Sequence, residues 1–263
     1  MNPLDIYKKL PRSNCGKCPA LTCMSFALRL SKNECSASEC PGIDERSKKE
    51  IEAMLSRISR DKAGYGDWKQ ERIKELFKEI SAIDFSAIEE GIGAVSEHGK
   101  LKVKYMGREI VLDHSDFYEQ LGVWDKLLVL MYIKNAGSVS LSRRWTAFRD
   151  LKNGLIRAES FNETCETPLA RMFGENRESF INKLIAMGAE KITGFSTEYS
   201  FVVHPLPKIP FLILIWPGEA GIDSYQEDFE PACKVLLDST AADFLDVEAL
   251  LYLGLSLMNA VRT

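Results

Sequence analysis

Four cysteines near the start of the chain constrain its fold more than any other feature. This four-cysteine set consists of Cys15, Cys18, Cys23 and Cys40, spaced Cys-x2-Cys-x4-Cys-x16-Cys-Pro. A cubane iron–sulfur cluster needs four thiolates that converge from different directions, and a tight loop with three ligands plus one distant return provides them. Gly16 lets the backbone approach such a cluster, and Pro41 turns the chain away after the last ligand. The spacing therefore predicts an iron–sulfur cluster.

Structural zinc and uncoordinated thiols are the two alternatives for these cysteines. Zinc sites usually combine two close cysteine pairs, whereas here only Cys15 and Cys18 form such a pair unless Cys35 joins Cys40. Cys35 is thus the ambiguous ligand, and the Cys-Pro ending favours Cys40 over it. We interpret Cys35 as a bystander and prefer the iron–sulfur cluster, with the other two possibilities left open.

Composition and charge argue against several classes of protein. A formal charge of -4 lacks the excess of Lys and Arg that a nucleic-acid surface needs. Residues 1–10 lack the apolar stretch of a secretory signal, and the most apolar run, residues 211–216, is far shorter than the roughly 20 residues of a membrane-spanning helix. Five of the seven cysteines lie between Cys15 and Cys40, so metal ligation explains them better than disulfides. We expect a cytoplasmic protein that binds neither nucleic acid nor membrane.

The segments around the cysteines resemble a known cluster domain. They are DIYKKLP at 5–11, NCGKC at 14–18, TCMSFALRL at 22–30 and Cys40-Pro41. They resemble the N-terminal [4Fe-4S] domain of the corrinoid iron–sulfur protein large subunit and of related acetyl-CoA decarbonylase/synthase subunits. In that family the four cysteines hold a low-potential cluster that reactivates an oxidised corrinoid cobalt. The resemblance implies that the four-cysteine set ligates a [4Fe-4S] cluster; it covers about one sixth of the chain, so the corrinoid role does not transfer with it.

Hydrophobic periodicity divides the chain into three parts. A small helical iron–sulfur module is expected at 1–43, a helical connector at 44–82 and a mixed α+β domain at 83–263. Apolar stripes predict two connector helices, over 44–62 and 68–80, separated at Gly64 and Gly66; packing explains the stripes better than partner docking. Further predicted elements are helices over 24–30, 123–135, 161–173, 175–187 and 246–261, a hairpin over 100–112, and strands over 200–204, 211–216 and 233–237. Helices and strands in unequal groups predict the α+β class.

Six segments of the third part resemble a prokaryotic domain family of unknown function. They are RRWTAFRDLKNG at 143–154, PL at 168–169, FG at 173–174, LPKIP at 206–210, LIWPGE at 214–219 and LDVEAL at 245–250. The resemblance covers residues 85–260, and members of that family are often fused to an iron–sulfur module of this kind. It supports the two-part architecture and implies no activity.

Segment 143–149 carries the best candidate for ligand binding in the α+β domain. Guanidinium groups and aromatic rings crowd there, a mixture suited to a planar or anionic ligand. The group comprises Arg143, Arg144, Trp145, Phe148 and Arg149. The alternative is a loop that its two aromatic rings anchor to the core.

Histidine offers few ligands for a heme or a cobalt. Of His98, His114 and His204, His114 is the best placed because it lies between Asp113 and Asp116 after a predicted strand. An ordinary solvated or hydrogen-bonded side chain is the commoner role for each of them. No hydrolase motif is present, and Cys165 and Cys233 lie in contexts typical of structural thiols.

These patterns together predict anaerobic electron transfer. The cluster would pass electrons to a redox centre that is held by the α+β domain or docked against it, with a corrinoid or other tetrapyrrole as the acceptor that the first resemblance implies. The expected partner is a redox protein or a corrinoid protein. One alternative is a redox-sensing module that binds a ligand or a protein. Another is a small-molecule reductase acting near Arg143–Arg149, and only this last role would make the chain an enzyme, a cluster-dependent oxidoreductase.

Overall fold

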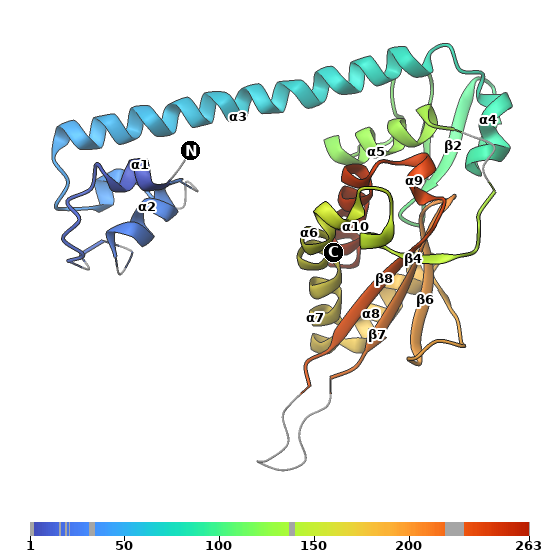
Figure 1. Ribbon diagram of the computed structural model, residues 1–263. Helices are drawn as coiled ribbons and strands as arrows, with labels where there is room; N and C mark the ends of the chain where they lie inside the picture. The colour runs from blue at the N-terminus through green and yellow to red at the C-terminus, as the bar shows by residue number, and fades with distance from the viewer. Residues whose placement is uncertain are drawn as a thin grey trace. The chain divides into compact units, whose positions relative to one another are not determined.

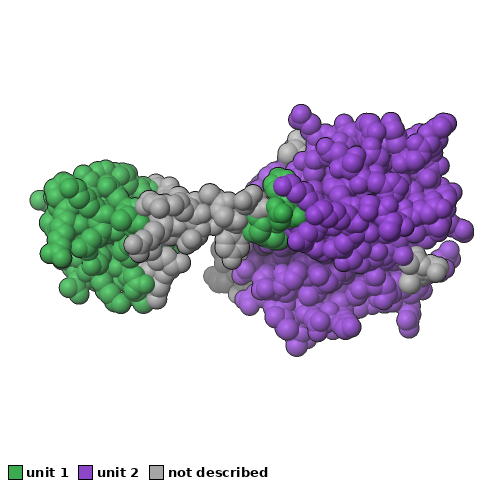
Figure 2. All heavy atoms as spheres, turned by 90° about the horizontal axis from the view of Figure 1, so that it is seen from above, with its two compact units in different colours: residues 1–71 green, residues 72–263 purple. Residues whose placement is uncertain are grey.

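The computed structural model describes most of the chain. It covers residues 3–15, 17, 18, 20, 22–31, 35–136, 140–218 and 229–262, and for residues 3 and 56–67 it describes the backbone alone. The described residues group into two compact units, residues 1–71 and residues 72–263 (Figures 1 and 2). Each unit has its own hydrophobic core and is described separately.

The first unit is built around the apolar faces of short helices. Its elements are α1 (Pro3–Tyr7), α2 (Cys23–Ser31), the 3-10 turn η1 (Ala37–Glu39) and the beginning of α3 (Glu45–Ile80). The buried residues of α2 follow the i, i+3, i+4, i+7 spacing of a single helix face. Phe26 and Leu30 from that face share one core with Ile6 of α1 and Ile51 of α3. The predicted helix over 24–30 is confirmed.

One continuous helix, α3, occupies nearly all of the predicted connector over 44–82. It runs from Glu45 to Ile80, so the predicted break at Gly64 and Gly66 was wrong. Each glycine costs a helix about 1 kcal/mol relative to alanine, whereas a break would leave two further helix ends with unpaired N–H and C=O groups. Flanking side-chain pairs also favour the helix, for example Arg72 with Glu75 at 2.8 Å.

A three-stranded antiparallel sheet opens the second unit. It consists of β1 (Val95–Glu97), β2 (Lys100–Tyr105) and β3 (Arg108–Leu112), preceded by α4 (Phe85–Ile92) and followed by α5 (Val123–Lys134). Two-residue turns, His98-Gly99 and Met106-Gly107, join the strands, and all four turn residues have positive φ, as type I′ turns require. The hairpin predicted over 100–112 is confirmed, while α4 and β1 were not predicted.

A five-stranded antiparallel sheet forms the centre of the second unit. Its order is β4-β8-β7-β6-β5, with β4 (Trp145–Ala147), β5 (Glu190–Lys191), β6 (Tyr199–Leu206), β7 (Ile209–Trp216) and β8 (Ala232–Asp238). Every residue of β7 except Trp216 is buried, which explains its continuous apolar sequence. The three strands predicted from the sequence correspond to β6, β7 and β8, and the fold is α+β as expected.

Helices pack beside this sheet. They are α6 (Ala158–Phe161), the π-helical turn η4 (Asn162–Glu166), α7 (Thr167–Glu175), α8 (Arg177–Ala186), α9 (Ala241–Phe244) and α10 (Val247–Arg262), with 3-10 turns η2 (Phe148–Asp150) and η3 (Gly154–Arg157). Helix α7 contacts β8, and α10 contacts α5 and η4 (Figure 1). The helix predicted over 161–173 is present, with the π-helical turn as a local irregularity inside it, because α6, η4 and α7 follow one another without a gap. None of the described helices combines the length and the apolar composition needed to cross a bilayer.

Candidate functional site

The third cysteine of the four-cysteine set begins a helix. Cys23 is the first residue of α2, and its backbone N–H donates to Oδ1 of Asn14 at 2.8 Å. Thr22 caps the same helix, because its Oγ1 accepts the N–H of Ser25 at 3.1 Å. The cysteine loop is thereby fastened to the N-terminal end of α2, where the helix dipole favours negative charge such as that of a thiolate.

Three members of the four-cysteine set lie in or against one apolar core. Cys23 and Cys40 are buried, and the half-buried Cys18 packs against the same core. Cys40 follows η1, whose first turn is closed by a capping box between Ser36 and Glu39. The return of the chain to the core is thus fixed by local hydrogen bonds.

The first cysteine differs from the others because it is exposed. Hydrogen bonds from the backbone N–H of Lys17 and from the side chain of Ser13 lower the pKa of the Cys15 thiol, which favours the thiolate that a metal binds. Gly16, the glycine expected to face the cluster, lies outside the described residues. Cys35 is half-buried and packs against the core that Cys18, Cys23 and Cys40 share, so burial alone does not separate it from the predicted ligands.

The donor chemistry fits a cluster, although the thiols are not gathered into one ligand shell. Among the residues that the structure describes, no three His, Cys, Asp or Glu side chains lie close enough together to hold a metal ion. Four soft thiolate donors within residues 15–40 are nevertheless the chemistry that iron–sulfur clusters use. Because metal binding and folding are coupled in sites of this kind, we expect metal–thiolate bonds to bring about the final convergence.

In the second unit, the segment from Arg143 to Arg149 is fixed by its backbone. Residues Trp145–Ala147 form β4, which pairs with the C-terminal end of β8. Asp238, at that end, is buried and accepts the backbone N–H groups of Ser142 and Arg143 at 3.1 and 2.7 Å. Burial on its own raises the pKa of Asp238, but hydrogen bonds from Thr240 and Ser142 outweigh it and the net shift is downward.

Two of the predicted ligand-binding residues reach a pocket. Arg144 and Trp145 line a cavity of about 620 Å³, together with Asp150, Lys152 and Asp243 among others. Both signs of charge therefore face this cavity, which we call the β4 pocket. It has the size of a small-molecule site.

The other residues of the predicted group are placed differently. Phe148 is buried and stacks on Phe161 with ring centroids 4.1 Å apart, so it anchors the segment as the alternative interpretation proposed. Arg149 is exposed, and its Nε lies 3.7 Å from Oδ1 of Asp150. Neither Arg143 nor Arg149 is among the described residues that line the β4 pocket.

His114 makes contacts typical of a structural histidine. Its ring stacks on Phe85 with centroids 4.0 Å apart, and its Nε2 lies 2.9 Å from the carbonyl oxygen of Ile83. A carbonyl oxygen can only accept, so Nε2 carries the proton in this contact. Coordination of a tetrapyrrole by His114 stays a prediction.

Two buried carboxylates were not predicted from the sequence. Asp238 is the last residue of β8, and Glu166 on the π-helical turn accepts the Val235 N–H at 3.0 Å and the Lys234 ammonium at 2.9 Å. The only sequence signal was an acidic residue next to an apolar strand or helix. Burial raises the pKa of Cys165 and Cys233, the two thiols nearby, as expected of structural cysteines.

Comparison with known families now assigns the second unit. Residues 84–260, more than half of the chain, match the family described as "Domain of unknown function (DUF3786)". The chain belongs to the DUF3786 family. The match contains both sheets and the helices from α4 onward, and only the last two residues of α10 lie beyond it. The description of this family assigns no activity, so the pockets and charged side chains of the domain itself are what indicate its role.

The cysteine module matches a different family. Residues 10–41 match the family described as "Putative Fe-S cluster", a range that contains the whole four-cysteine set. This match supports an iron–sulfur cofactor in the module. Together the two matches give the DUF3786 domain a separate iron–sulfur module on its N-terminal side.

Curated relatives resemble part of this DUF3786 chain. Acetyl-CoA decarbonylase/synthase complex subunit gamma of Methanopyrus kandleri is 36% identical over 56 residues, 21% of this chain and 12% of that protein. The corrinoid/iron-sulfur protein large subunit of Moorella thermoacetica is 38% identical over 53 residues, 20% of this chain and 12% of that protein. Subunit gamma of Methanosarcina acetivorans is 27% identical over 134 residues, 43% of this chain and 28% of that protein. The chain thus spans less than a third of each of these relatives, and no solved structure matches it.

Proposed function

We propose that this protein transfers electrons through a [4Fe-4S] cluster held by Cys15, Cys18, Cys23 and Cys40. The cluster module would comprise residues 1–43, and residues 44–82 would connect it to the α+β domain. That domain, residues 83–263, would hold or dock the electron acceptor. The observation that carries this proposal is the four-cysteine set, whose spacing suits a cubane and which lies inside the segment 10–41 that matches the iron–sulfur family.

The exposure of Cys15 supports a role in electron transfer. Cys23 and Cys40 belong to the apolar core and Cys18 packs against it, whereas Cys15 is exposed. A cluster ligated by all four would be shielded from water on one side and close to the surface on the other. Such a position lets an acceptor approach while burial tunes the reduction potential.

A corrinoid or other tetrapyrrole is the acceptor that we favour. One of the partial relatives carries a name that points to this chemistry, the corrinoid/iron-sulfur protein large subunit. In this proposal the physiological partner is a redox protein or a corrinoid protein, and the work of the protein is anaerobic.

Anaerobic purification tests the cluster directly. We expect about four iron and four sulfide per chain, a brown preparation, and an electron paramagnetic resonance signal of a reduced [4Fe-4S] cluster after dithionite. Zinc in place of iron would contradict the proposal. Mixing the reduced protein with a cob(II)alamin-containing protein then tests the acceptor, and an unchanged corrinoid spectrum at every ratio would remove the corrinoid version while leaving the cluster intact.

The β4 pocket supports a second candidate, a small-molecule reductase or redox-sensing ligand module. Arg144 and Trp145 place a guanidinium group and an aromatic ring at a cavity of about 620 Å³. Arg144→Ala and Trp145→Ala should abolish reductant-dependent turnover in a reductase, or redox-dependent ligand affinity in a sensor, while the cluster content stays unchanged. Arg149→Ala serves as the matched control because Arg149 does not line the pocket.

A further inference from the structure

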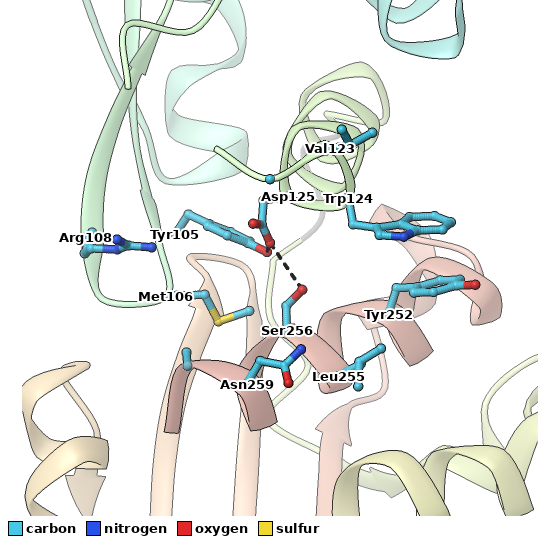
Figure 3. Close-up of a pocket in the computed structure, with 12 residues that line it drawn as sticks. Tyr105, Met106, Arg108, Val123, Trp124, Asp125, Tyr252, Leu255, Ser256 and Asn259 are labelled. Atoms are coloured by element: carbon cyan, nitrogen blue, oxygen red, sulfur yellow. Dashed lines mark hydrogen bonds between the residues drawn. The ribbon is translucent and has the colours of Figure 1, made fainter. Parts of the chain in front are cut away.

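A second cavity of the DUF3786 domain lies between the β2–β3 hairpin, the N-terminal end of α5 and the last turns of α10 (Figure 3). Its volume is about 410 Å³, which is within the range of small-molecule sites. The lining residues are Tyr105, Met106, Arg108, Gly122, Val123, Trp124, Asp125, Tyr252, Leu255, Ser256, Asn259 and Ala260. We call it the hairpin pocket. None of the residues singled out from the sequence lines it.

A carboxylate at the centre of the hairpin pocket is held by two hydroxyl groups. Oδ1 of Asp125 accepts the Tyr105 hydroxyl at 2.5 Å and the Ser256 hydroxyl at 3.2 Å. Burial and the negative charge of Asp125 raise the pKa of Tyr105, so its hydroxyl stays protonated and keeps donating. Both described hydrogen bonds fall on Oδ1, which leaves Oδ2 as the oxygen to which a ligand can donate.

A positive charge lies on the same side of the hairpin as Tyr105. Arg108 is the direct cross-strand partner of Tyr105 next to the two-residue turn, and opposed residues of an antiparallel pair project from the same face. Figure 3 shows Arg108 and Tyr105 at one side of the pocket, with Asp125 and Ser256 in its middle. The pocket therefore presents a guanidinium group and a carboxylate to the same small volume.

The remaining wall is aromatic and apolar. Trp124 and Tyr252 stack on each other with centroids 3.9 Å apart on the side opposite Arg108 (Figure 3). Met106 and Leu255 add apolar surface. Aromatic faces next to a carboxylate favour a cationic group, because ring quadrupole and negative charge attract it together.

We propose that the hairpin pocket binds a small zwitterion of the amino-acid class, whose ammonium group donates to Asp125 and whose carboxylate group pairs with Arg108. The two charges of the pocket are complementary to the two charges of such a ligand, and an arginine fork suits a carboxylate. A simple anion would be repelled by the carboxylate of Asp125, and a simple cation would be repelled by the guanidinium group of Arg108. Each is therefore disfavoured relative to the zwitterion.

Binding to the full-length protein tests this proposal. The probes are the twenty L-amino acids, β-alanine, 4-aminobutyrate and 6-aminohexanoate, measured by isothermal titration calorimetry and by ligand-observed NMR. We expect at least one zwitterion to bind with a Kd below about 1 mM. The matched amine and the matched carboxylic acid, each lacking one charge of that probe, should bind at least about tenfold more weakly. No binding by any probe, or equal binding of the singly charged analogues, would overturn the proposal.

Variants link the binding to the two charged residues. Arg108→Gln should weaken the zwitterion about tenfold or more and should leave the affinity of the matched amine unchanged, because only the carboxylate contact is lost. Arg108 is exposed, so this variant is expected to fold. Lys104→Gln is the control, since it removes the same charge from the neighbouring cross-strand pair, Lys104–Glu109, whose side chains project from the opposite face of the hairpin. Equal losses in both variants would show a general charge effect and would contradict the assigned site.

Discussion

Asp238 accepts the backbone N–H of Arg143 at 2.7 Å, which joins the end of β8 to a segment 95 residues earlier in the chain. The same carboxylate also accepts from Ser142 and Thr240, through both the backbone N–H and the hydroxyl group of each. It thereby fixes the start of β4, and Arg144 and Trp145 reach the β4 pocket from that fixed backbone.

Removing the Asp238 carboxylate should destabilise the DUF3786 domain. Asp238→Ala leaves the donors of Ser142, Arg143 and Thr240 without their acceptor in a buried site, and we expect a loss of about 3 kcal/mol in the free energy of unfolding. Asp238→Asn keeps one acceptor oxygen and should lose about half as much. Urea unfolding followed by circular dichroism measures both. Losses below about 0.5 kcal/mol in both variants would show that the network is not needed.

The lowered pKa of Asp238 gives a prediction about pH. The folded protein holds the ionised carboxylate better than the unfolded chain, whose aspartate titrates near pH 3.9. The stabilisation is therefore fully present above that pH and is lost as the pH falls through the lower folded pKa. The stability difference between the wild-type protein and Asp238→Asn should be constant from about pH 5 to 7 and should shrink below about pH 4. A difference that grows on acidification would contradict the assignment.

Glu166 gives a second buried-carboxylate prediction. Its Oε1 accepts the Val235 N–H at 3.0 Å, at the point where the pairing of β4 with β8 has ended at Leu236. Glu166→Ala should cost about 3 kcal/mol of unfolding free energy because that strand N–H loses its acceptor. Glu166→Gln keeps an acceptor for this N–H and loses only the negative charge facing Lys234. The Lys234 side chain is 42% exposed and can be solvated instead, so we expect a loss of about 1 kcal/mol in unfolding free energy. Thermal unfolding of the two variants should separate them, and equal losses would assign the effect to charge alone.

Two turn glycines with nearly identical backbone angles allow a matched comparison. Gly99 and Gly107 have φ of 77° and 76°. A Cβ at Gly107 would lie 2.6 Å from the backbone of Met187, whereas one at Gly99 would meet nothing within 4 Å. Gly99→Ala should cost about 1 kcal/mol for the positive φ alone, and Gly107→Ala at least about 2 kcal/mol more for the close approach. Similar unfolding midpoints for the two variants would show that the backbone near Met187 moves to accommodate the added methyl group.

The sequence predictions that were confirmed depend on local patterns. The α2 helix, the β2–β3 hairpin and the apolar run of β7 each depend on residues a few positions apart, so periodicity and turn chemistry were sufficient. The contacts of Asp238 and Glu166 join residues roughly seventy to one hundred positions apart, and the sequence carries no local sign of them. The hairpin pocket was missed for the same reason, since Tyr105, Asp125 and Ser256 come from three separate elements.

The ligand assignment of the cysteine module leads to the last prediction. Cys35 packs against the same core as Cys40, so the choice between them depends on the Cys-Pro spacing rather than on burial. Cys35→Ser should retain iron, sulfide and colour, because in the proposed assignment serine replaces a thiol that is not a ligand. Cys40→Ser should lose most of the iron, because a cubane keeps its stability only with all four thiolates. Iron content and the absorbance near 400 nm measure both variants after anaerobic purification. The reverse result would exchange the roles of these two cysteines, and equal retention of iron in both would show that neither is needed as the fourth ligand.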